Sequence, residues 1–190
     1  MPISRLLCAT FATLILASGA SAQQPGTATA MLKTADGKPG GTARFTDTSK
    51  GVMEIAVEAM GLTPGQHGMH VHQNPDCAPG PAADTGKIIP FGATGGHFDP
   101  MNTKNHSHPG DPKGHAGVLP MIKAGADGNA KATHTTRSLS VAAGKASVVG
   151  RSLVIHEKED DFKSDPSGNS GGRVLCGLIE AAKPTGVAGR

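Results

Sequence analysis

The chain has 190 residues, and its 27 glycines and 14 prolines, about a fifth of the sequence, disfavour long regular helices. Eighteen Lys and Arg against fifteen Asp and Glu give a formal net charge of +3, too balanced to indicate nucleic-acid binding. Three cysteines exclude a disulfide-dense miniprotein, and five Phe without Trp or Tyr require a mainly aliphatic core. The composition therefore predicts one loop-rich, mostly β domain.

The first 22 residues have the pattern of a secretory signal peptide. Arg5 gives a positive start, residues 6–17 are almost wholly apolar, and Ala20-Ser21-Ala22 is typical of a cleavage site. This apolar run is too short for a membrane-spanning helix, which needs about 20 residues. We therefore predict a signal peptide over residues 1–22, a single domain over residues 23–190, and a periplasmic or secreted location. The two cysteines left, Cys77 and Cys176, predict one disulfide in an oxidising compartment.

Short apolar or alternating stretches separated by Gly-containing turns predict β-strands. In chain order these are Thr27–Thr34, Thr42–Thr46, Val52–Met60, Gly68–Gln73, Val118–Ile122, Ala130–Thr136, Ser147–Val149, Ser152–His156 and Arg173–Ala181. Asp127-Gly128 is a hairpin-turn signal between two of them. Two irregular segments, residues 74–117 and 157–172, are long enough that we expect a functional role. Many short strands with two long loops predict an all-β sandwich or barrel.

The histidines indicate what the first long loop does. Six of the nine lie between His67 and His108, and His115 follows in the same loop region. His70 and His72 are two residues apart on a predicted strand, so both imidazoles point to one face while Val71 points to the other. Two imidazoles on one face form half of a site suited to copper or zinc. His-x-His alone is weak evidence, but three further histidines in one Gly-rich loop make ordinary surface histidines the poorer interpretation.

Four segments resemble motifs of the copper/zinc superoxide dismutase family, in the family's order. Residues 65–72 (GQHGMHVH) resemble the strand of the copper ligands, and residues 95–100 (GGHFDP) resemble the segment of the bridging histidine. Residues 150–158 (GRSLVIHEK) resemble the strand of the last copper ligand. Residues 168–177 (GNSGGRVLCG) resemble the segment with the active-site arginine and second cysteine. The spacing from Cys77 to His97 and the exported context resemble the bacterial periplasmic branch.

The resemblance implies a Greek-key β-sandwich, or flattened barrel, of about eight antiparallel strands with two long functional loops. It also implies site residues, which are the copper ligands His70, His72, His97 and His156, the zinc ligands His97, His106 and His115, the carboxylate Asp160 that links His70 to His106, the guiding cation Arg173, and the disulfide pair Cys77 and Cys176. His97 and Arg173 are the implied catalytic residues, with His97 bridging both metals and delivering a proton to the reduced substrate.

The chain departs from the family at one position. Three residues after the second zinc-loop histidine the family has an aspartate that completes the zinc site, whereas this chain has Val118 after His115. Structural zinc normally has four protein ligands. We expect either a weakened zinc site with three imidazoles, which we favour, or a fourth ligand recruited from Asp111 or His108.

The predicted activity is dismutation of superoxide to dioxygen and hydrogen peroxide, with copper and zinc as cofactors. Two alternatives are a secreted copper-binding or copper-delivery protein, and a catalytically silent scaffold of the same family. A delivery protein would not need Arg173, and a silent scaffold would be expected to have lost a copper ligand or the arginine. We predict superoxide as the substrate partner, no nucleic acid and no membrane span, and we leave a homodimer open.

Overall fold

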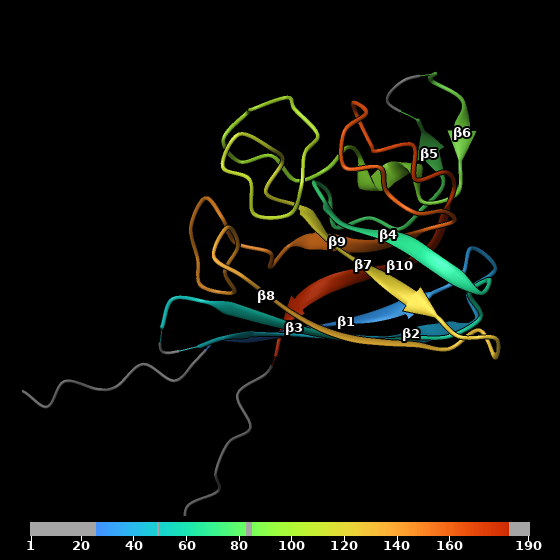
Figure 1. Cartoon of the computed structure of the whole chain (residues 1–190), viewed down its shortest axis with the longest axis horizontal. Helices are drawn as coiled ribbons and strands as arrows, with labels where there is room; N and C mark the ends of the chain where they lie inside the picture. The colour runs from blue at the N-terminus through green and yellow to red at the C-terminus, as the bar shows by residue number, and fades with distance from the viewer. Residues whose placement is uncertain (1–25, 49, 83–84, 183–190) are drawn as a thin grey trace, which may run out of the picture.

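The computed structural model describes residues 26–48, 50–82 and 85–182 (Figure 1). The predicted signal peptide, residues 1–22, lies outside the described residues. No helix in the described part of the chain has the length and apolar character needed to cross a bilayer.

Eight antiparallel strands close into a barrel in the order β1-β10-β9-β4-β7-β8-β3-β2. The strands are β1 (Thr27–Lys33), β2 (Pro39–Asp47), β3 (Met53–Ala59), β4 (Gly65–His72), β7 (Val118–Ala124), β8 (Ala130–Thr136), β9 (Arg151–His156) and β10 (Arg173–Ala181). Because β4 lies beside β9 and β3 beside β8, the chain crosses between non-consecutive strands in the Greek-key manner. The predicted all-β Greek-key fold is confirmed.

Alternation of apolar and polar residues creates the barrel core. In β3, Met53, Ile55, Val57 and Ala59 are buried while the residues between them are more exposed, so these four side chains face the barrel core. Strand β4 differs, because its last six residues are all buried. Its inner face packs on the core and its outer face lies under the long loops, which Figure 1 shows gathered on the side of the barrel with β4 and β9.

Two sequence predictions need correction. Ser147–Val149 is not a strand, since Ser147 makes only an isolated bridge to Ser140 in the turn-rich connection between β8 and β9. The first long loop also has structure that the sequence pattern did not indicate, namely the two-stranded pair β5 (Gly80–Pro81) and β6 (Ile88–Ile89) and the 3-10 turn η1 (Gly92–Thr94). The hairpin turn at Asp127-Gly128 is confirmed between β7 and β8, with the Gly125 carbonyl accepting from the Gly128 N–H.

The disulfide between Cys77 and Cys176 joins the first long loop to β10, as predicted. It packs with Phe91 and Val154 in a small apolar cluster on the outside of the barrel. Closing a segment with a sequence separation of 99 residues stabilises the fold by about 4.7 kcal/mol in the chain-entropy account. The same bond holds the loop that carries His97 against the strand that begins at Arg173.

Candidate metal centre

Strand β4 presents two histidines outward from the barrel. His70 and His72 are 0% and 1% exposed, and Val71 between them lies in the barrel core. The strand alternation expected from the sequence is therefore confirmed. Because the loops cover the outer face of β4, both imidazoles are removed from water.

Four imidazoles from three segments meet above this face. Their nearest ligand nitrogens all lie within 4.8 Å of one another, and every side chain is buried. The ring centroids of His70 and His97 are 3.9 Å apart, and those of His72 and His97 are 5.0 Å apart. The group consists of His70 and His72 from β4, His97 from the first long loop, and His156 from the end of β9.

The hydrogen bonds of these rings determine which nitrogens carry protons. His72 Nδ1 donates to the Gly95 carbonyl at 3.0 Å, and His156 Nδ1 lies 3.4 Å from the Gly171 carbonyl, so a carbonyl acceptor faces each Nδ1. The two Nε2 atoms then carry lone pairs, and they face each other at 3.4 Å. Two lone pairs at this distance repel, and a cation between them would remove the repulsion. The donor set therefore fits a metal ion, and imidazoles of this kind suit copper.

A second group shares His97. The ligand nitrogens of His97, His106 and His115 also lie within 4.8 Å of one another. Both ring nitrogens of His97 and the Nδ1 atoms of His106 and His115 are buried without a hydrogen-bond partner. Buried polar atoms normally have partners, so these atoms fit a second metal ion with His97 between the two groups.

Burial favours the neutral form of three imidazoles in the four-histidine group. It lowers the pKa of His72, His97 and His156 well below the usual range, and the neighbouring imidazoles lower each pKa further. Neutral imidazole is the form that binds metal ions.

Asp160 connects the two groups. Its carboxylate accepts from His70 Nε2 at 2.6 Å and from His106 Nε2 at 2.8 Å, and all three side chains are buried. Burial raises the pKa of Asp160, but the hydrogen bonds from His106 and His70 outweigh burial and hold the pKa well below its usual range. Because each imidazole donates from Nε2, its Nδ1 carries the lone pair that faces its metal group. The carboxylate therefore sets the orientation of one ligand in each group.

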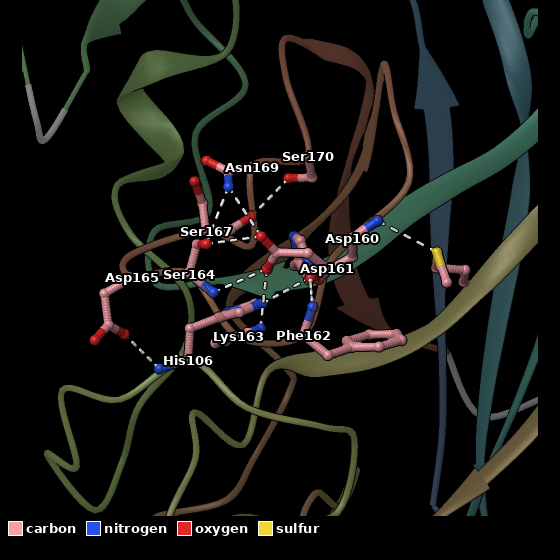
Figure 2. A network of polar contacts seen from close by, with 12 residues as sticks. His106, Asp160, Asp161, Phe162, Lys163, Ser164, Asp165, Ser167, Asn169 and Ser170 are labelled. Atoms are coloured by element: carbon pink, nitrogen blue, oxygen red, sulfur yellow. Dashed lines mark hydrogen bonds and ion pairs between the residues drawn. The ribbon is translucent and has the colours of Figure 1, made fainter.

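The loop between β9 and β10 holds Asp160 in place through a polar network (Figure 2). The neighbouring Asp161 accepts from the backbone N–H groups of Lys163 and Ser164 and from the Asn169 side chain, and hydrogen bonds to Ser164 lower its pKa to about 2. Gly168 has a φ of +64°, and a Cβ there would overlap Asp160 Oδ1 and crowd His106 Nε2. The site therefore requires glycine at this position.

Arg173 lies at a hollow beside the four-histidine group. The hollow has a volume of about 280 Å³, and its lining includes Arg173, His97 and His156. The guanidinium donates from Nη1 to the Phe91 carbonyl at 2.8 Å and from Nη2 to the Gly95 carbonyl at 2.9 Å. A planar cation with fixed orientation at this hollow suits a small anion.

Val118 is 2% exposed and pairs with His70 across the β4–β7 ladder. Asp111 and His108 were the alternative zinc ligands, but among the described residues neither belongs to a cluster whose ligand atoms lie close enough to hold a metal ion. Asp111 accepts from Ser107 Oγ at 2.6 Å and from the Lys113 N–H at 2.8 Å, and His108 packs against Phe162. The second group therefore contains three imidazoles and no carboxylate.

The sequence reasoning did not identify two polar residues of the site. Thr94 lies between Arg173 and His72, and Asp161 organises the loop that carries Asp160. Asp161 lies in the charged run of residues 157–163, but a run of charges alone does not distinguish a carboxylate that organises a loop from one that is only solvated. Nothing in the local pattern distinguishes Thr94 from other loop threonines.

The protein is an antiparallel barrel with two histidine groups that share one imidazole. These features are those of a β-barrel protein with a two-metal centre. The family model for copper/zinc superoxide dismutase matches residues 39–179, and the chain therefore belongs to that family. It is 45% identical over 170 residues to the Cu-Zn superoxide dismutase of Deinococcus radiodurans, with 88% of this chain and 91% of that protein covered. It is 40% identical over 162 residues to the extracellular Cu-Zn superoxide dismutase of Brugia pahangi, with 80% and 75% covered. The solved Cu/Zn superoxide dismutase from Brucella abortus aligns with a TM-score of 0.68 and 38% identity, covering 81% of this chain and 99% of that one.

Replacing Asp160 with asparagine tests its connecting role. Asn offers one oxygen acceptor and one NH₂ donor, so it can accept from only one of the two imidazole N–H groups, and the other meets a donor. We expect Asp160→Asn to weaken metal binding by about 10- to 100-fold, measured by competition with a chelator. Glu159→Gln removes the same charge from the exposed neighbouring residue and serves as the control. Equal metal affinity in Asp160→Asn and Glu159→Gln would contradict the role.

Proposed function

We propose that this protein dismutates superoxide at a copper ion held by His70, His72, His97 and His156, beside a zinc ion held by His97, His106 and His115. Two superoxide anions and two protons give one dioxygen and one hydrogen peroxide. The observation that carries the proposal is the set of buried nitrogen lone pairs, which converge on two positions separated by the single imidazole of His97. Membership of the copper/zinc superoxide dismutase family supports it.

Bound copper supplies a one-electron couple that takes an electron from one superoxide and gives it to the next, which zinc cannot do. The protein contributes the surroundings of this step. Arg173 attracts the anion into the hollow and orients it beside His97 and His156. When the ring nitrogen of His97 that faces the four-histidine group is not binding copper, it would hold a proton and donate it to the reduced oxygen product, and water would supply the second proton. Its burial keeps bulk water from competing for this proton.

The two alternatives account for less of the site. A copper-delivery protein has no need for a guanidinium held by several acceptors at the mouth of the copper group. A silent scaffold has no need to retain all four imidazoles of that group with their ligand atoms close together. Both features favour an antioxidant enzyme.

The signal-peptide pattern over residues 1–22, the disulfide, and the extracellular relative support export to the periplasm or the cell exterior. We infer that residues 23–190 are the exported, single-domain protein. Superoxide is the proposed substrate partner.

Removing one copper ligand tests the function directly. In the metal-loaded protein, His156→Ala leaves three imidazoles in the copper group, and we expect it to abolish superoxide consumption while the disulfide and the far-ultraviolet circular dichroism persist. His134→Ala is the matched control, because His134 lies on β8 outside both metal groups and should leave activity near the wild-type value. Wild-type activity in a metal-replete His156→Ala sample would overturn the copper assignment.

Reversing the charge at Arg173 tests attraction of the anion. We expect Arg173→Glu to lower the second-order rate constant by about one to three orders of magnitude, because local fields at a cleft change association rates by that range. The wild-type rate should also fall as salt rises, since the Debye length shortens from about 30 Å at 0.01 M to about 10 Å at 0.1 M. Arg44→Glu makes the same charge change on exposed β2, away from the hollow. Equal rates in the two variants would favour the copper-delivery alternative.

The zinc half is proposed to bind metal weakly. The carboxylates that surround its loop are already engaged, since Asp99 accepts from the Lys104 N–H at 2.8 Å and Asp165 accepts from the His106 N–H at 2.6 Å. Asp111 is likewise occupied by Ser107 and Lys113. Recruiting any of them would break an existing hydrogen bond and order more of the loop, at a cost in free energy.

Restoring a carboxylate tests this weakness. We expect Val118→Asp to bind zinc at least about tenfold more tightly, which stabilises the zinc-loaded protein by about 1.4 kcal/mol per tenfold through mass action and raises its melting temperature. Asn has nearly the same shape as Asp but no charge, so Val118→Asn should raise the zinc affinity less than Val118→Asp does. Zinc retention during dialysis against a chelator is the measurement. If the wild type keeps one zinc per chain throughout and Val118→Asp changes nothing, a substitute ligand exists.

A further inference from the structure

Thr94, the last residue of η1, is a fully buried polar residue between the two functional parts of the site. Its hydroxyl oxygen lies 2.6 Å from Arg173 Nη1, 3.3 Å from His72 Nδ1 and 2.9 Å from the Phe91 carbonyl oxygen. Arg173 and His72 belong to different strands, β10 and β4. One side-chain oxygen therefore contacts both the cation at the hollow and an imidazole of the four-histidine group.

Only one arrangement of hydrogens satisfies all three contacts. A hydroxyl has one hydrogen to donate and two lone pairs. The Phe91 carbonyl can only accept, so it takes the hydroxyl hydrogen, and the guanidinium can only donate, so it uses one lone pair. The second lone pair faces His72 Nδ1, which must then carry a hydrogen, shared with the Gly95 carbonyl at 3.0 Å. In this arrangement His72 Nε2 keeps the lone pair that faces His156.

The backbone of Thr94 is fixed without help from its side chain. Its carbonyl accepts from the Asn74 N–H at 2.9 Å, and its N–H donates to the Phe91 carbonyl at 3.2 Å. The neighbouring Gly96 carbonyl accepts from the Gln73 N–H at 3.0 Å. Loss of the hydroxyl should therefore leave the turn in place, because the backbone bonds remain, and remove only the side-chain contacts to Arg173, His72 and the Phe91 carbonyl.

We propose that Thr94 is a positioning residue that sets the direction of the Arg173 guanidinium and the Nδ1–H tautomer of His72 through one hydroxyl group. The proposal rests on the roles given to Arg173 and His72 above. Without the hydroxyl, one Nη1–H of Arg173 loses its acceptor, and the cation can turn away from the hollow. His72 then keeps only the Gly95 carbonyl to define its tautomer.

The test compares Thr94→Val, which keeps the branched shape and removes the hydroxyl, with Thr94→Ser, which keeps the hydroxyl. Both are made in the full chain loaded with copper and zinc, and copper content is matched before measurement. The probe for the anion is azide, titrated against the Cu(II) absorption bands. The electron paramagnetic resonance spectrum of Cu(II) reports on the ligand geometry.

We expect Thr94→Val to weaken azide binding about tenfold or more, because a hydrogen bond to a charged group is lost, and to lower the second-order rate by a similar factor and alter the Cu(II) spectrum. Thr94→Ser should restore all three quantities to within about twofold. Thr94→Ala provides a second hydroxyl-free variant, without the additional methyl group of valine. It should show the same three changes, and it serves as the test if Thr94→Val folds poorly. A wild-type azide affinity and spectrum in Thr94→Ala, or equal behaviour of Ser and Ala variants, would overturn the proposal.

These outcomes are separable from the proposed function. If the wild-type protein consumes no superoxide, the function fails, but the azide titration and the Cu(II) spectrum still report on Thr94. If the wild type is active and the hydroxyl-free variants match it in every readout, only the role of Thr94 fails.

Discussion

The buried carboxylate of Asp160 is the contact on which the rest of the site depends. It lies on the loop after β9, yet it accepts from His70 on β4 and from His106 in the first long loop. A buried charge is costly unless it is hydrogen-bonded, so these contacts hold both loops against the barrel. The Gly68 N–H donates to the Lys158 carbonyl at 2.7 Å, which attaches the same loop to the strand of the histidines. The same set of contacts therefore orients one histidine of each group and attaches the loops to the barrel.

The parts of this arrangement that depend on local pattern could be predicted from the sequence. Alternation placed His70 and His72 on one face of a strand and Val71 in the core, because that geometry needs only neighbouring residues. The parts that depend on long-range contacts could not. Ser147–Val149 has the composition of a strand but finds no partner strand, and Thr94 acquires its partners from residues 22 and 79 positions away. The role of Asp160 came from resemblance to a family, since spacing alone cannot indicate which distant groups meet, whereas the disulfide followed from the two cysteines left after the predicted signal peptide.

The two metal groups share His97 but differ in how completely the protein surrounds a cation. The first group has four imidazoles, and carbonyl or carboxylate partners set the lone pairs of three of them, His70, His72 and His156, so it is largely preorganised. The second has three imidazoles, and Val118 packs in the β4–β7 ladder without offering a ligand. His115 is only half-buried. Backbone N–H groups of its loop donate to Asp99 and Asp111 of the same loop and to Asp165 of the loop between β9 and β10. The order of the loop that carries His106 and His115 therefore depends more on these hydrogen bonds than on a bound cation.

The charge of the protein as a whole is small, so attraction of an anion must come from a local arrangement. A net charge of +3 over 190 residues gives little long-range field. The hollow instead presents a single guanidinium whose position is fixed by two carbonyls and a hydroxyl. All three acceptors come from residues 91–95, the segment that leads directly into His97. Because the disulfide joins the same loop to β10 three residues after Arg173, the cation and the shared imidazole are positioned by one continuous set of contacts. A displacement of this loop would move the anion site and the metal site together.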